Sequence, residues 1–95
     1  MSEKQQKNRR KKVVLSLHAP QADTVLLAGD FNQWHPEKHV LKKGKNGAWE
    51  TRLMLSPDTY EYKFVVDGKW QTDPVNPRTC QNCFGTANNL LTVAE

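Results

Sequence analysis

Apolar and polar residues alternate along most of the chain with a period of two, which is typical of half-buried β-strands. The clearest runs cover residues 13–18, 49–55 and 59–66, where every second residue except Thr51 is apolar or aromatic. Two further strands are predicted in "TVLLAGDF", which begins at Thr24, and in "NLLTV" at residues 89–93. Turn-forming sequences separate these runs every ten residues or so, and no segment shows a helical period. The pattern predicts an all-β sandwich or barrel.

The segment "FVVDGKWQT" predicts one hairpin and its register. Asp67-Gly68 suits a type I′ turn, which needs positive φ at both central positions. A two-residue turn here pairs Val65 with Trp70, and directly paired residues share a face of the sheet. Trp70 and Lys63 are therefore expected as diagonal neighbours on the solvated face. The opposite face is predicted to be core and carries Tyr60, Tyr62, Phe64 and Val66.

The three tryptophans have different predicted environments. Trp49 alternates with apolar residues and is interpreted as core, whereas Trp34 lies in the turn sequence "GDFNQWHP" and Trp70 on a polar face. Trp34 and Trp70 could be half-exposed caps over the sandwich edge, since single surface apolar residues are common. Their neighbourhood of a lysine and the amide-rich "ANN" also suits a binding surface.

Such a surface matches the chemistry of a sugar. Axial C–H groups of a glucose ring pack on an indole face, while its hydroxyls need donors and acceptors at the edge of the indole. Lys63 can donate, and Thr86 and the asparagine amides can donate or accept. Single-stranded nucleic acid also stacks on aromatic rings, but it requires a positively charged groove.

Charge is concentrated at the start of the chain. The 95 residues carry a net charge of +4, and residues 1–12 alone, with six basic residues and Glu3, carry +5. The remaining eight basic and nine acidic residues leave 13–95 at −1, which disfavours nucleic acid as a partner of the folded part. Residues 1–12 are predicted to be a disordered basic tail, with contact to nucleic acid or anionic lipid as the alternative.

Length and composition indicate one domain, residues 13–95, with 37% hydrophobic and 25% charged residues. The sequence offers neither a signal peptide nor an apolar run of membrane-spanning length, so a cytoplasmic protein without membrane contact is expected. Cys80 and Cys83 form a single "CQNC" in a predicted loop. They are interpreted as ordinary thiols, with a disulfide or a metal site as alternatives, and no cofactor is predicted.

Three segments together resemble a known family. "VLLAGDFNQWHP", "GAWETRLMLSPDTYEYKFVVDGKWQTDPVNP" and "FGTANNLLTV" are similar to the glycogen-binding domain of the AMP-activated protein kinase β subunit. They also resemble the early-set modules at the N-termini of isoamylases and glycogen branching enzymes, which belong to carbohydrate-binding module family 48. The resemblance spans residues 13–93 and implies an immunoglobulin-like β-sandwich that binds α-1,4-linked glucan.

The resemblance also implies roles for six residues. The tryptophans that stack on glucose in the kinase modules match Trp34 and Trp70, and the lysine that donates to sugar hydroxyls matches Lys63. Phe84 stands where the family has a leucine that inserts into a cyclic glucan, so this chain departs from the family pattern there. The threonine and asparagine that bond hydroxyls match Thr86 and Asn88. The loop "NPRTCQNCFG" is also about one residue longer than in the kinase module.

Catalysis is not expected, because the acidic residues are scattered over turns and strands and a small sandwich offers little concavity. The predicted function is therefore non-catalytic binding of glycogen, starch or maltooligosaccharides. The alternative is an early-set protein-interaction module without sugar binding. A protein partner could bind through the tail or the sandwich edge.

Overall fold

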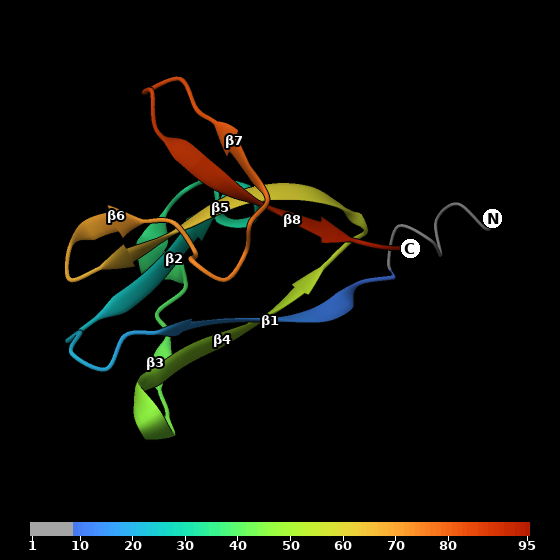
Figure 1. Cartoon of the computed structure of the whole chain (residues 1–95). Helices are drawn as coiled ribbons and strands as arrows, with labels where there is room; N and C mark the ends of the chain where they lie inside the picture. The colour runs from blue at the N-terminus through green and yellow to red at the C-terminus, as the bar shows by residue number, and fades with distance from the viewer. Residues whose placement is uncertain (1–8) are drawn as a thin grey trace.

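Two antiparallel sheets pack face to face in a β-sandwich (Figure 1). The structure is a computed structural model that describes residues 9–95. The first sheet has the order β1-β4-β3 and contains β1 (Lys11–His18), β3 (Lys42–Lys43) and β4 (Ala48–Leu55). The second sheet has the order β2-β5-β8-β7, and β6 also pairs with β5. Its strands are β2 (Val25–Gly29), β5 (Asp58–Val66), β6 (Lys69–Gln71), β7 (Thr79–Gln81) and β8 (Ala87–Val93).

Three short 3-10 helices occupy two of the connections, two of them between β2 and β3 and one between β3 and β4. These are η1 (Asp30–Asn32), η2 (Pro36–Lys38) and η3 (Lys45–Gly47). Residues 9–95 contain no α-helix, and none of their helices is long and apolar enough to cross a membrane. The predicted all-β, immunoglobulin-like sandwich is confirmed.

The core forms where the predicted apolar rows of the two sheets meet. Leu17 comes from the first sheet, and Leu27 and Phe64 from the second, each with at most 2% of its surface exposed. Burial of a side chain of this size stabilises the fold by about 1.5–3 kcal/mol. Trp49 is also buried, and its Nε1 donates a 2.8 Å hydrogen bond to the Ala19 carbonyl. Its predicted place in the core is confirmed.

The predicted β5–β6 hairpin is confirmed residue by residue. Val65 pairs with Trp70, and the turn residues Asp67 and Gly68 have φ of 49° and 84°. The Asp67 carboxylate also accepts hydrogen bonds from the backbone amides of Asp23 and Thr24, at 2.8 and 2.9 Å. The turn that follows β5 is thereby tied to the segment that precedes β2.

The strand bounds differ from the sequence prediction at several places. β2 ends at Gly29 and is followed by η1, so the strand predicted in "TVLLAGDF" does not extend to Phe31. β1 begins at Lys11, because Lys11 and Lys12 pair with Leu55 and Met54. The last two residues of the predicted tail, 1–12, therefore belong to the sandwich. Residues 1–8 of that tail lie outside the described residues. β8 begins at Ala87, not at residue 89. The segment predicted as a loop around the cysteines contains β7. This strand is polar and has no alternating pattern of its own, and it forms by pairing with β8.

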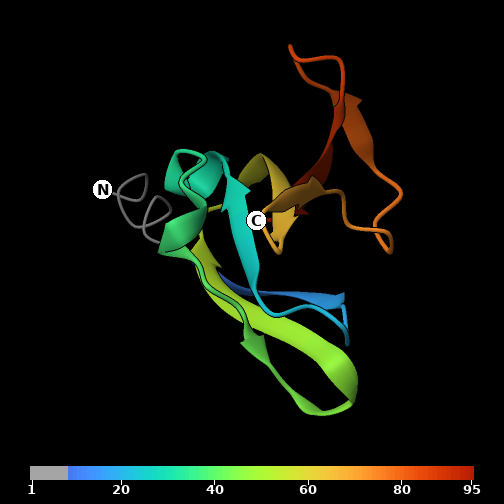
Figure 2. The same cartoon turned by 90° about the vertical axis from the view of Figure 1, so that its left-hand side faces the viewer.

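A buried polar cluster sets the position of the β7–β8 hairpin. Asn89 is fully buried, and its side chain accepts a 2.6 Å hydrogen bond from the Asp73 amide and donates to the Asn76 carbonyl at 3.0 Å. The Tyr62 hydroxyl donates to the Asp73 carboxylate at 2.8 Å, and burial raises the pKa of Tyr62 well above its ordinary value. These bonds hold residues 72–78 on the second sheet. The hairpin beyond them projects away from β1 and β4 (Figures 1 and 2).

Candidate functional site

One pocket of about 610 Å³ gathers the six residues that the sequence singled out. It lies on the outer face of the second sheet, between β5, β6, the turn after β2 and the β7–β8 hairpin. Three further residues contribute to its lining. The complete lining is Trp34, Glu61, Lys63, Trp70, Asn82, Cys83, Phe84, Thr86 and Asn88.

Two indole rings form the apolar part of the pocket. The ring centroids of Trp34 and Trp70 lie 6.3 Å apart, and the ring planes are inclined at 50°. Trp70 is 55% exposed although it is a large aromatic residue, and Trp34 is half-buried. The rings therefore present two inclined apolar faces, the shape required for two flat groups that turn relative to one another.

An unusual backbone conformation presents Trp34. Gln33 and Trp34 both lie in the left-handed region, with φ of 56° and 60°, which is rare for bulky residues. The turn is closed by the Trp34 amide, which donates to the Gly29 carbonyl at 2.9 Å. A Cβ atom at Gly29 would lie only 2.6 Å from the Phe31 ring and 2.7 Å from the Glu61 carbonyl. Only glycine fits this position.

Asp30 holds the indole of Trp34 against β5. One carboxylate oxygen accepts a 3.0 Å hydrogen bond from Trp34 Nε1, and the other accepts a 2.8 Å bond from the Glu61 amide. Sequence reasoning assigned Asp30 only to a turn. Its acidic side chain four residues before a tryptophan was the available signal, but the link to β5 depends on residues 31 positions apart.

Lys63 lies beside Trp70 as predicted, but it is not on a solvated surface. Only 8% of the residue is exposed, and it lines the pocket together with Trp70 and residues of the β7–β8 hairpin. Its Nζ donates to Thr86 Oγ1 at 3.1 Å, and no ion pair to Lys63 forms within the described part of the chain. A largely buried ammonium with one bonded proton retains two donors that can serve a ligand.

Asn82 organises the hairpin loop with four hydrogen bonds. Its Oδ1 accepts from the amides of Phe84 and Thr86, at 2.9 and 3.2 Å. Its Nδ2 donates to Thr86 Oγ1 at 2.8 Å and to Asn88 Oδ1 at 2.9 Å. Asn88 Nδ2 in turn donates to Glu61 Oε1 at 3.0 Å. Thr86 and Asn88 thus have fixed orientations, and Asn88 is a buried residue of β8.

The tip of the hairpin carries Phe84, which is 85% exposed and borders the pocket.

Cys80 and Cys83 are both free thiols. Burial, and secondarily the nearby Glu61 carboxylate, raises the pKa of Cys80. In residues 9–95, no three His, Cys, Asp or Glu side chains gather closely enough to hold a metal ion. The pocket therefore combines apolar rings with neutral and charged hydrogen-bonding groups.

Comparison with known proteins identifies related sequences. Residues 12–95 match the family described as "Glycogen recognition site of AMP-activated protein kinase". The chain is 41% identical over 73 residues to "Protein PTST homolog 2, chloroplastic" of Arabidopsis thaliana, a match that covers 77% of this chain and 13% of that protein. It is 38% identical over 71 residues to 5′-AMP-activated protein kinase subunit beta-1 of Sus scrofa, covering 75% of this chain and 55% of the subunit.

A solved structure shares the fold. The maltogenic amylase from S. marinus superposes with a TM-score of 0.76 at 26% identity, over 90% of this chain and 14% of the amylase chain. The chain thus spans well under two thirds of the length of each of these three relatives. What they share with it is a single domain.

Proposed function

Because the chain belongs to the family of glycogen recognition sites of AMP-activated protein kinase, we propose that its Trp34–Trp70 pocket binds α-1,4-linked glucan chains. The observation that carries the proposal is the placement of two inclined indoles around the donors of Lys63, Thr86 and Asn88 in one pocket. Neither apolar rings nor polar groups alone would suit a sugar, which offers both C–H faces and hydroxyls.

The geometry supports a division of roles. Successive glucose units of an α-1,4 chain turn relative to one another, and rings inclined at 50° can each pack against one unit. Lys63 Nζ, the Thr86 hydroxyl and the second Asn88 amide proton then donate to hydroxyl or ring oxygens. Phe84 offers an exposed apolar surface at the hairpin tip, where it can contact the outer side of the chain.

The domain is proposed to bind glucan without cleaving it. Glycosidases use a pair of carboxyl groups about 5 to 9.5 Å apart on either side of the scissile bond. Among the described residues that line the pocket, Glu61 is the only carboxylate. Asp30 is occupied by Trp34 and by the backbone of β5. The relatives are longer than this chain, so we propose that the domain brings an associated protein to the polymer. The cytoplasmic location stays a prediction.

Titration of the protein with maltoheptaose and with β-cyclodextrin, followed by tryptophan fluorescence, tests the proposal. Saturable change is expected for both ligands, and none for cellohexaose, whose β-1,4 links produce a flat, extended chain. The doubly substituted protein with Trp34→Ala and Trp70→Ala, in which Trp49 still reports, is the control for non-specific quenching. No response of the unmodified protein at millimolar maltoheptaose would show that the pocket serves another purpose, such as a protein contact.

A further inference from the structure

We propose that Glu61 is a ligand-binding residue of this pocket, which accepts hydrogen bonds from a pair of glucan hydroxyls. This inference rests on the proposed function and deepens it, because it specifies what the sugar must offer. Glu61 lies on β5, two residues from Lys63 on the same outer face, and it lines the pocket with the two tryptophans. Sequence reasoning gave it no binding role.

The hydrogen bonds within the pocket leave Glu61 as its principal free acceptor. Thr86 Oγ1 accepts from both Lys63 Nζ and Asn82 Nδ2, so its lone pairs are used and the hydroxyl can only donate. Asn82 Oδ1 accepts from two backbone amides. Asn88 Oδ1 accepts from Asn82 and retains one lone pair. These groups are therefore committed mainly to donating to a ligand or to holding the hairpin.

A sugar hydroxyl that accepts from these donors still has its own proton to place. A hydroxyl proton that finds no acceptor in the buried contact reduces the binding free energy by about 1–3 kcal/mol. The carboxylate of Glu61 has about four lone-pair sites; one accepts from Asn88 Nδ2 at 3.0 Å and the Cys80 thiol lies nearby, so further sites remain for a ligand. A carboxylate also accepts from two neighbouring hydroxyls at once, through its two oxygens.

The charge of Glu61 adds selectivity. Lys63 lies on the same face of β5 but forms no ion pair with Glu61 within the described residues, so each charge remains available to the pocket. A neutral chain with free hydroxyls satisfies both charges, the ammonium through its oxygens and the carboxylate through its protons. Glucan whose hydroxyls are capped satisfies only the ammonium.

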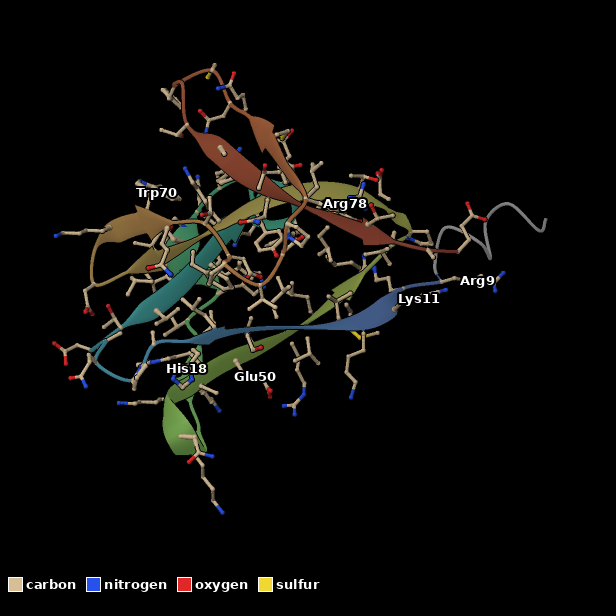
Figure 3. The ribbon with its side chains drawn as sticks, viewed as in Figure 1. Arg9, Lys11, His18, Glu50, Trp70 and Arg78 are labelled. Carbon is tan, nitrogen blue, oxygen red and sulfur yellow. The ribbon has the colours of Figure 1, made fainter. Side chains whose placement is uncertain are left out.

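Substitution of Glu61 by glutamine separates these contributions. The amide oxygen of Glu61→Gln can still accept from Asn88, while its NH₂ replaces the acceptor that faces the ligand. We expect affinity for β-cyclodextrin to fall about tenfold, the value of one hydrogen bond to a charged acceptor. Glu50→Gln is the matched control, since it removes the same charge from the opposite face of the sandwich (Figure 3).

A second ligand checks the role of the sugar protons. Heptakis(2,6-di-O-methyl)-β-cyclodextrin keeps its oxygens as acceptors but loses most hydroxyl donors. Methylation should weaken binding to the unmodified protein by a larger factor than binding to Glu61→Gln. Equal factors in the two proteins, or unchanged β-cyclodextrin affinity in Glu61→Gln, would overturn the role of Glu61 while leaving glucan binding intact. Absence of binding to the unmodified protein would instead overturn the proposed function.

Discussion

The indole Nε1 of Trp34 donates a 3.0 Å hydrogen bond to Asp30 Oδ1, and the second oxygen of the same carboxylate accepts from the Glu61 amide at 2.8 Å. The orientation of a ring in a surface turn is thus fixed to the central strand of the second sheet. Because Trp34 also has a positive φ, the turn holds a conformation that its sequence does not favour by itself.

Asp30→Ala should therefore weaken glucan binding through Trp34. We expect a loss of about 1 kcal/mol in binding free energy, comparable with one hydrogen bond, as measured by calorimetric titration with β-cyclodextrin. The same substitution in a Trp34→Phe background, which lacks the indole N–H, should have a much smaller effect. An equal loss in both backgrounds would show that Asp30 acts on the turn as a whole and not on the indole.

Trp70→Ala should reduce affinity by about 1–3 kcal/mol, the value of one stacked ring and its buried area, and leave the fold intact. Since Trp70 is 55% exposed, its removal opens no cavity in the core. Trp49→Ala is the contrasting variant, because Trp49 is buried and its loss should lower the free energy of unfolding by about 3–5 kcal/mol. Urea unfolding followed by circular dichroism distinguishes the two. Collapse of the sheet signal in Trp70→Ala would contradict a binding role.

Asn82→Ala should loosen the hairpin loop and weaken glucan binding, because it removes the bonds that orient Thr86 and Asn88. Amide hydrogen exchange at Thr86 should accelerate, since its N–H loses the Asn82 acceptor. Gln81→Ala, an exposed residue of β7, is the matched control and should change neither quantity. Unaltered exchange in Asn82→Ala would show that the backbone of the hairpin holds the loop without the side chain.

Acid should destabilise the fold through His39. Asn32 Nδ2 donates to the Leu27 carbonyl and lies 2.8 Å from His39 Nδ1, so this ring nitrogen must accept and the imidazole must be neutral. Burial, and secondarily the charge of Lys38, lowers the pKa of His39 from its ordinary value of 6.5. His39 therefore binds a proton more readily in the unfolded chain than in the folded one. The stabilisation that neutral His39 contributes to the fold is complete above pH 6.5.

The free energy of unfolding should accordingly fall as the pH decreases from 6.5 through the lower pKa of the folded state. Urea titrations between pH 5 and 8, compared with a His39→Gln variant, isolate this contribution. His35→Gln, at an exposed position, is the control and should retain the pH dependence of the unmodified protein. If the His39→Gln variant had the same pH dependence as the unmodified protein, another group would be the origin of that dependence.

Local pattern was sufficient for the strands that carry alternating apolar residues and for the hairpin at Asp67-Gly68. It failed for β7, because "TCQ" has no apolar alternation and becomes a strand only by pairing with β8. It also placed Lys63 in solvent, since a period of two says which face a residue occupies but not what covers that face. Lys63 is buried, and its Nζ bonds to Thr86 of the β7–β8 hairpin, 23 positions further along the chain.

The sheet faces and the position of Trp70 beside Lys63 follow from the amino-acid sequence alone, because they depend on neighbours along one strand or across one short turn. The segments that resemble a glucan-binding family are likewise visible in the sequence. The meeting of the turn at Trp34, the outer face of β5 and the tip of the β7–β8 hairpin in one pocket is a property of the tertiary fold. The fold also sets which atoms of the pocket remain free to bind a ligand. The bond from the Glu61 amide to Asp30, the bond from Lys63 to Thr86 and the bond from Asn88 to Glu61 each join residues distant in sequence, which only folding brings within hydrogen-bonding distance.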